Sequence, residues 1–280
     1  MIDGGEQVSG TAVAATIGLV AVLASLSLVP AGIALARRVF PGRNVSFARW
    51  GFSHVGAAIF LYFAATLLVL YGARALSLDL EGAVAQVAVS AGLQLVTIAM
   101  VALFARQLDP LGLRSLGLRA DRTWPAVAVG FTSYLIALPA IAGAAQISNW
   151  LWPTLGFELV TQDVVQLAAG LSGAELALFS ALAVVVIPLC EELFFRAFLQ
   201  PLLVQNLGDR GGVLITALLF TSVHANLLTC LPMFALSLVL GSVMLRTQHI
   251  ASCWFVHALH NGLTLALLAA VPQSRDWLGP

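Results

Sequence analysis

Residues 12–36 read AVAATIGLVAVLASLSLVPAGIALA, a run that contains no charged side chain and ends at Arg37 and Arg38. At about 1.5 Å per residue, a helix of this length covers the roughly 30 Å hydrocarbon core of a bilayer. A surface helix of a soluble protein would instead carry a charged or polar stripe along one face. The run therefore predicts a membrane-spanning helix.

Seven further apolar stretches follow, and Glu175 is the one charged residue within them. They lie at 50–73, 84–105, 125–148, 173–190, 213–228, 231–245 and 250–271. Hydrophobic residues make up 60% of the 280 and charged residues only 9%, against roughly 25% charged in a soluble domain. We predict an all-α polytopic membrane helix bundle with about eight transmembrane helices. The stretch from 231 is short for a full crossing, which leaves a count of seven open.

Arginine placement predicts the orientation of the bundle. All 13 basic residues are arginine and 13 acidic residues balance them, so net charge indicates no nucleic-acid partner, and we expect none. Short arginine-rich loops stay in the cytoplasm. If both termini lie outside, eight crossings put every arginine except Arg74 and Arg275 on the cytoplasmic side, with Arg196 and Arg210 sharing one inner loop. We therefore expect a multi-pass protein of the plasma or inner membrane with both termini outside.

The N-terminus carries no sign of a cleavable signal peptide. Residues 1–10 contain Asp3 and Glu6 but no basic residue, whereas a signal peptide begins with a positively charged region. We expect the first apolar stretch to be retained in the membrane.

Ionisable residues gather in the last four apolar stretches, and within a membrane such residues are costly and usually functional. The segment 191–196 reads EELFFR, so Glu192 and Arg196 share a helix face and can pair, while Glu191 points about 100° away. The segments 220–224, FTSVH, and 257–261, HALHN, each place two polar or aromatic side chains one turn apart.

The depth of these residues in the membrane provides an independent test, because one site needs side chains at one level. Counting from the expected inner loops, Glu191, His224, His257 and Asn261 all lie roughly 12 to 18 Å from the inner face at about 1.5 Å per residue. We therefore expect them to meet in one site that opens to the cytoplasmic side.

The three segments resemble the motifs EExxxR, FxxxH and HxxxN of the CAAX prenyl endopeptidases and their bacterial relatives, the CPBP or ABI family of intramembrane proteases. The resemblance covers about residues 170–270, and every motif position is occupied as in the family. It implies an intramembrane endopeptidase that acts on a membrane-associated or prenylated, CAAX-type peptide. We accordingly expect one membrane domain, 1–280, with N-terminal helices and an outer loop in 1–170 and catalytic core helices in 171–270.

The resemblance also implies a role for each motif residue. Glu191 activates a water with help from His224, and His257 and Asn261 stabilise the oxyanion. A positioned carboxylate contributes typically about 10² to 10⁴ in rate as a general base. We expect Glu192 and Arg196 to be a structural pair, and Phe220 to pack beside the site.

Glu191, His224 and His257 are also a plausible zinc ligand set. We expect no metal and no other cofactor, because the chain has no HExxH helix and asparagine is an uncommon zinc ligand. We interpret His260 as structural, since it points roughly 60° away from His257 around the helix.

Two other functions compete with the peptidase. The chain could be a non-catalytic membrane protein of the same fold, such as an immunity or scaffolding factor. It could also be a proton-coupled transporter, although the inverted repeat or broken helix pair typical of transporters is not evident.

Overall fold

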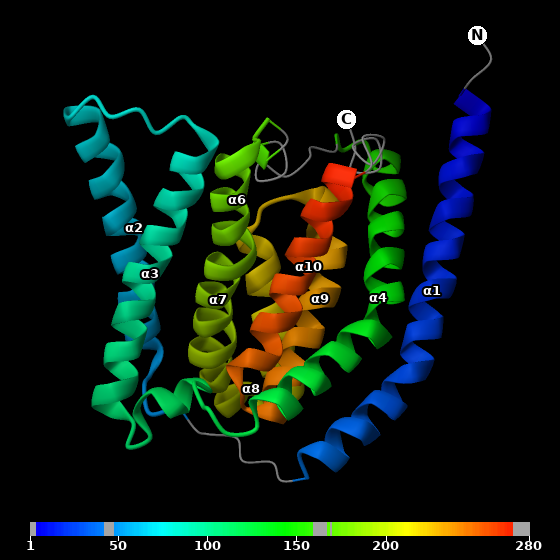
Figure 1. The fold of residues 1–280 in the computed structure, drawn as a ribbon. Coiled ribbons are helices and arrows are strands. Elements are labelled where there is room, and N and C mark those ends of the chain that lie inside the picture. The colour runs from blue at the N-terminus through cyan, green and yellow to red at the C-terminus, as the bar shows by residue number, and fades with distance from the viewer. Residues whose placement is uncertain (1–3, 42–47, 159–166, 169, 271–280) are drawn as a thin grey trace.

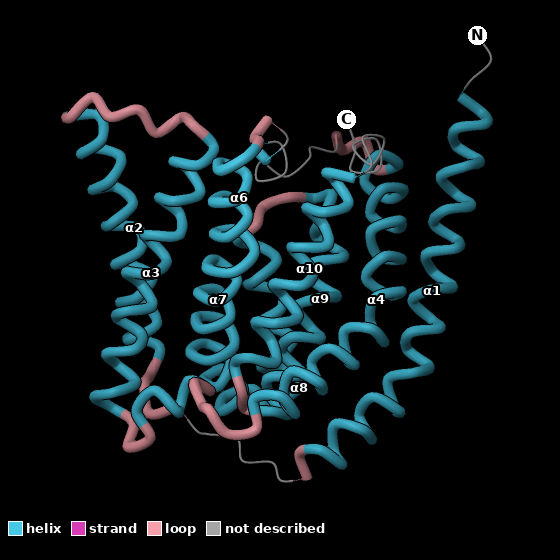
Figure 2. The backbone as a smooth tube through the Cα atoms, viewed as in Figure 1, coloured by secondary structure: helices cyan, strands magenta, loops and turns pink. Residues whose placement is uncertain are grey.

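The structure is a computed structural model that describes residues 4–41, 48–158, 167–168 and 170–270. These residues form helices and connecting loops without any strand, which confirms the all-α fold class (Figures 1 and 2). Helices suit a membrane because each one satisfies its backbone hydrogen bonds internally. The helices are α1 Gly4–Val39, α2 Phe52–Ala75, α3 Ala83–Leu108, the short 3₁₀ helix η1 Gly112–Leu116, α4 Thr123–Thr154, α6 Gly173–Ala181, α7 Ile187–Glu192, α8 Gln200–Val223, α9 Leu227–Thr247 and α10 Ile250–Ala270.

Seven helical stretches of the described chain are long and apolar enough to cross a membrane. One of them, Gly173–Val223, has 51 residues, which at about 1.5 Å per residue is more than twice the thickness of a bilayer core. The chain reverses inside this stretch at Gly208, whose φ of 70° and ψ of 173° are not helical. If the helical segments before and after Gly208 are counted as two crossings, the seven stretches become eight crossings, the number that the sequence predicts.

Two helix boundaries differ from the prediction. The helix that carries the apolar stretch 173–190 and the segment 191–196 continues to the turn at Gly208, because Glu192 and Arg196 are buried in the bundle and Arg196 does not lie in a loop. The connection before α9 lies at 224–226, where the Asn226 side chain accepts the Thr229 backbone N–H at 3.1 Å and so caps the helix. This earlier start gives α9 21 residues, enough for a full crossing.

The two faces of the bundle differ in charge. Helices α1, α3 and α9 all end on the lower side in Figure 1, and their last turns carry Arg37, Arg38, Arg106 and Arg246. We call this the arginine side. On the opposite side, which we call the terminus side, α1 begins and α10 ends. The structure therefore agrees with the predicted alternation of the helices, whichever side faces the cytoplasm.

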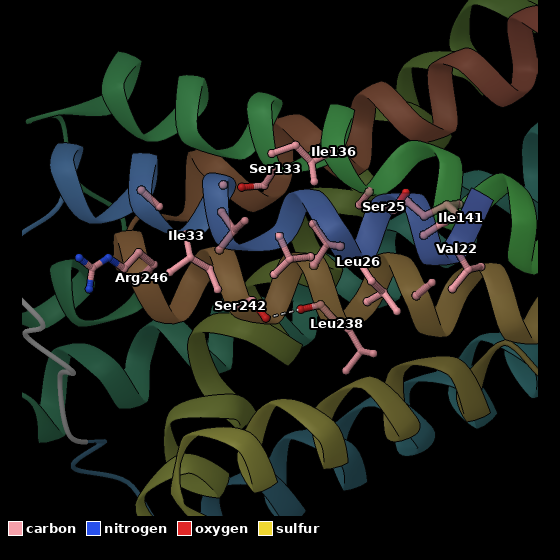
Figure 3. Close-up of a pocket in the computed structure, with 18 of the residues that line it drawn as sticks. Val22, Ser25, Leu26, Ile33, Ser133, Ile136, Ile141, Leu238, Ser242 and Arg246 are labelled. Atoms are coloured by element: carbon pink, nitrogen blue, oxygen red, sulfur yellow. Dashed lines mark hydrogen bonds between the residues drawn. The ribbon is translucent and has the colours of Figure 1, made fainter. Parts of the chain in front are cut away.

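Helix α1 lies along α4 at the edge of the bundle (Figure 1). The two backbones come so close that a Cβ atom on Gly143 would stand 2.3 Å from the Gly18 carbonyl oxygen. Between α1, α4 and α9 lies an apolar cavity of about 740 Å³, with Arg246 at one end (Figure 3). None of the motif residues lines this cavity, so the candidate site lies elsewhere.

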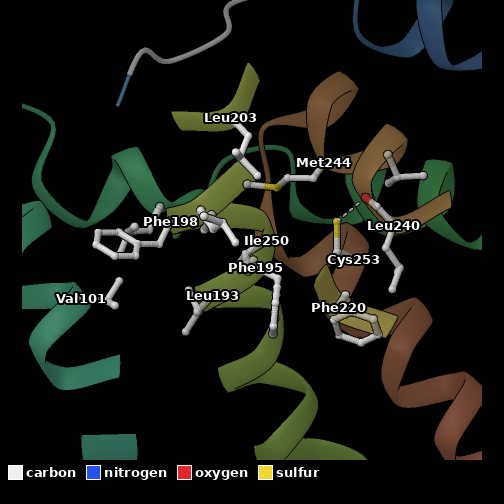
Figure 4. Close-up of a cluster of buried hydrophobic side chains, with 14 of the residues drawn as sticks. Val101, Leu193, Phe195, Phe198, Leu203, Phe220, Leu240, Met244, Ile250 and Cys253 are labelled. Atoms are coloured by element: carbon white, nitrogen blue, oxygen red, sulfur yellow. Dashed lines mark hydrogen bonds between the residues drawn. The ribbon is translucent and has the colours of Figure 1, made fainter. Parts of the chain in front are cut away.

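The main core lies toward the arginine side, where the helices from 193 onward meet α3 and η1. Figure 4 shows part of it, with Phe198 on the side of Val101 of α3 and Phe195 on the side of Phe220 of α8. Trp50, just before α2, joins this core by stacking on Phe198 with 5.0 Å between ring centroids. Its indole N–H also donates to the Phe198 carbonyl at 2.8 Å. This core lies between the candidate site and the arginine side.

Candidate active site

The two adjacent glutamates lie on a helix that is interrupted on both sides by π-helical turns. α7 carries Glu191 and Glu192, and it is preceded by the π-helical segment η2, Leu182–Val186, and followed by η3, Leu193–Leu199. Pro188 lies near the start of α7, where its missing N–H disturbs the regular α-helical pairing. π-Helical turns are rare and occur frequently at functional sites.

Glu191 lies between two histidines from two other helices. Its Oε1 is 4.0 Å from His224 Nε2 at the end of α8, and its Oε2 is 3.7 Å from His257 Nε2 on α10. Both separations exceed a direct hydrogen bond and fall within the span that one bridging water can cover. The Glu191 side chain is 18% exposed, so it is sheltered but reachable.

Each histidine ring is held by its other nitrogen. His224 Nδ1 lies 2.7 Å from the Phe220 carbonyl oxygen, and because a carbonyl only accepts, Nδ1 carries the hydrogen. His257 Nδ1 lies 2.9 Å from Glu192 Oε1, which is an acceptor when ionised. Both rings are thereby oriented with Nε2 toward Glu191.

Glu192 is fully buried and has two partners. Besides His257, it forms an ion pair with Arg196, with 3.3 Å between Oε2 and Nε. Arg196 is also fully buried and donates from Nη2 to Ser237 Oγ at 3.0 Å. The predicted pairing of Glu192 with Arg196 is present, whereas the contact of Glu192 with His257 was missed, because helix periodicity reveals neighbours on one helix only. The prediction that Arg196 lies in an inner loop is wrong, since the arginine is inside the bundle.

Phe220 packs at the centre of this cluster. Its ring centroid lies 4.8 Å from that of His224 and 5.7 Å from that of His257. The Arg196 guanidinium carbon lies 4.6 Å above the same ring, a cation–π contact. Phe220 thus fixes the two histidines and the arginine by packing, as the sequence predicts.

Asn261 lies one turn beyond His257 on α10 and lines the same cavity. Its amide donates to the Ala183 carbonyl at 3.1 Å, and the Trp254 indole N–H donates to the Val185 carbonyl at 3.0 Å. Both carbonyls belong to η2, so the π-helical turn provides the acceptors that fasten α10 to the glutamate helix. The Asn261 amide has a second N–H, which remains for another acceptor.

All four predicted catalytic residues line one cavity of about 600 Å³, together with side chains from α3, α4, α9 and α10. His260 lines it as well, with Nδ1 3.0 Å from the Tyr134 hydroxyl oxygen, a position that the sequence pattern does not predict. Its partner is on α4, so helix spacing could not reveal the pair. Glu175 is exposed in the first turn of α6, apart from the site.

The side chains present do not form a metal centre as they stand. Among the described residues, no group of three or more His, Cys, Asp or Glu is arranged to hold a metal ion. His224 Nε2 lies 4.0 Å from Glu191 Oε1 and His257 Nε2 lies 3.7 Å from Glu191 Oε2, slightly farther than the roughly 3.3 Å between tetrahedral ligands about 2 Å from one zinc ion.

One comparison with known proteins gives a match to part of the chain. Residues 173–263, about a third of the chain, match the family model of the type II CAAX prenyl endopeptidase Rce1-like proteins. The matched segment begins with α6 and contains all three motifs. No curated protein and no solved structure gives a significant match. The family match confirms the resemblance found in the sequence, and together with the apolar helices it supports an integral membrane protein that is a protease.

Proposed function

We propose that the chain is an intramembrane endopeptidase in which Glu191 activates a water for attack on a peptide bond. One observation carries the proposal: the Nε2 atoms of His224 and His257 face the two carboxylate oxygens of Glu191, at 4.0 and 3.7 Å, inside a cavity within the helix bundle. A carboxylate so placed can hold a water between itself and the imidazoles.

The proposed reaction has two steps. Glu191 takes a proton from the water, and the oxygen of that water bonds to the scissile carbonyl carbon, which becomes a tetrahedral oxyanion. The C–N bond then breaks, and Glu191 returns the proton to the leaving amine. Because His224 Nδ1–H is engaged by the Phe220 carbonyl, its Nε2 lone pair is free to accept the other hydrogen of the water and so orient it.

His257 and Asn261 are the proposed oxyanion partners. In the proposed mechanism His257 donates Nδ1–H to Glu192 and acts in its doubly protonated form, so that Nε2–H donates to the developing negative charge. With His257 in this form the cluster has zero net charge, because the carboxylates of Glu191 and Glu192 balance Arg196 and the imidazolium. Zero net charge lowers the free-energy cost of burying the four groups together. Removal of one oxyanion donor typically costs about 10² to 10³ in rate.

The proposed substrate is a membrane-associated or prenylated peptide. The cavity of about 600 Å³ has room for a few residues of an extended chain, and its walls are mostly apolar with scattered amide and hydroxyl groups. Such walls accept apolar side chains while the polar groups bind peptide backbone.

Substrate trapping tests the proposal and needs no substrate chosen in advance. Tagged Glu191→Ala protein is isolated from native membranes and the bound peptides are identified by mass spectrometry, with Glu175→Ala as the matched control at an exposed site. We expect peptides enriched on Glu191→Ala, and the same peptides cleaved by the parent and by Glu175→Ala. The proposal fails if the parent and Glu191→Ala leave these peptides equally intact or cleave them equally fast.

A further inference from the structure

The Glu191 cavity extends beyond the motif residues. Four of its polar lining residues lie toward helix ends on the terminus side: Gln86 and Ser90 in the first turns of α3, Thr229 in the first turn of α9, and Thr264 beyond Asn261 on α10. In Figure 1 α3 and α9 begin, and α10 ends, on the upper side of the bundle. The cavity therefore runs from Glu191 toward the terminus side.

In the opposite direction the site is closed. Glu192, Arg196, Phe198 and Phe220 have no exposed surface and lie between the cavity and the arginine side. Gln200, one turn farther, is also buried and donates from its amide to the Gly241 carbonyl at 2.9 Å. We call these five buried side chains the packed floor of the cavity. A substrate approaching from the arginine side would have to displace them.

The distribution of charged residues indicates which side of the bundle faces the cytoplasm. Arg37, Arg38, Arg106 and Arg246 at helix ends lie on the arginine side, joined by Arg114, Arg119 and Arg122 between α3 and α4, whereas Arg74 in the last turn of α2 lies on the terminus side. The described connection between α2 and α3, on the terminus side, carries Asp79 and Glu81 instead. Under the positive-inside rule, the arginine side faces the cytoplasm. The two sequence-based expectations, termini outside and a site opening to the cytoplasm, are therefore incompatible, because cavity and termini share one side.

We infer that substrate enters the Glu191 cavity from the non-cytoplasmic side of the membrane. This inference rests on the proposed peptidase function and narrows its substrate to a peptide segment presented outside the cell or in the outer leaflet. A prenylated tail held at the cytoplasmic surface would meet the packed floor. Gln86, Gln94 and Ser90 along the α3 wall supply donors and acceptors for the backbone of an extended segment.

Cysteine accessibility tests the inference independently of catalysis. Three substitutions are made singly in a Cys230→Ser background, which removes the partly exposed native thiol: Ser90→Cys in the cavity, Glu81→Cys on the terminus side and Arg114→Cys on the arginine side. Sealed cells are treated with a membrane-impermeant maleimide before and after permeabilisation. We expect Ser90→Cys and Glu81→Cys to be labelled in sealed cells, and Arg114→Cys only after permeabilisation.

Each other pattern overturns the inference. Labelling of Ser90→Cys only after permeabilisation means access from the cytoplasm, and no labelling in either state means that no open path exists. If the labelling pattern is as expected while trapping on Glu191→Ala fails, the proposed function is wrong and the direction of the cavity stands.

Discussion

Glu191 and Glu192 are neighbours in the sequence, yet their surroundings differ sharply. Glu191 is 18% exposed and faces the cavity, whereas Glu192 has no exposed surface and contacts Arg196 and His257. The difference follows from the helix, which turns successive side chains by about 100°. One carboxylate is thus available for chemistry while the other holds an imidazole in place.

Substitution of Glu192 separates these two contributions. We predict that Glu192→Gln destabilises the protein by about 3 to 5 kcal/mol, because it leaves Arg196 buried without its counter-charge. Turnover should also fall, because a neutral amide is a weaker acceptor than a carboxylate for His257 Nδ1–H and holds the ring less firmly. Thermal unfolding in detergent and peptide cleavage measure the two effects.

The double variant Glu192→Gln/Arg196→Gln is the matched control. It removes both buried charges, so stability should recover in part, while cleavage should stay low because His257 still lacks an anionic partner. Full recovery of cleavage would contradict the positioning role of Glu192.

The sequence predicted the residues of the candidate site better than the contacts between helices that hold those residues in place. The spacing within 191–196, 220–224 and 257–261 named Glu191, His224, His257 and Asn261, and the structure brings all four to one cavity. Contacts between helices could not be read from spacing, because they depend on how whole helices pack. For this reason the sequence missed the link from Glu192 to His257 and the pair of His260 with Tyr134.

Apolar runs marked the helices well, whereas the distribution of arginines placed one residue wrongly. Arg196 was expected in an inner loop, yet it pairs with Glu192 inside the bundle and the helix continues to Gly208. The π-helical turns η2 and η3 have no signature that periodicity detects. Their effect is tertiary, since the Ala183 and Val185 carbonyls of η2 bind side chains of α10.

The N-terminus of α10 depends on a neutral histidine. His249 precedes the helix, and its Nδ1 accepts the Ala251 backbone N–H at 3.2 Å, so this nitrogen carries no proton. Its Nε2 lies 3.2 Å from the Thr123 hydroxyl. Burial, and next the positive charge of Arg119, lower the pKa of His249 below its ordinary value of 6.5.

A lowered pKa makes stability depend on pH with a definite sign. As pH falls below about 6.5 the unfolded chain binds the proton before the folded chain does, so stability is lost with acidity. We predict that the parent loses up to about 1 kcal/mol, the typical contribution of a helix cap, between pH 7.5 and 5.5. His249→Asn, whose side-chain oxygen can accept the same N–H, should lose less. Equal slopes of melting temperature against pH in the two proteins would contradict this prediction.

The segment that matches the family model does not form the Glu191 cavity alone. Residues 173–263 supply the motif side chains, whereas α3 and α4 supply part of the walls through Gln86, Ser90 and Ala142. The sequence predicted these first helices only as generic spans. The division of the single domain near residue 170 remains a prediction, and the Glu191 cavity is lined by helices from both parts.

We propose that Glu191 and the two histidines hydrolyse peptide bonds without a metal. The most direct measurement is cleavage of a trapped peptide by purified protein in liposomes, after metal removal verified by elemental analysis, in the parent and in Glu191→Gln. We predict that the metal-free parent cleaves and that Glu191→Gln is slower by about 10² or more, the usual contribution of a general base. Equal rates in the two proteins, or activity lost with the metal and restored by zinc, would contradict the account.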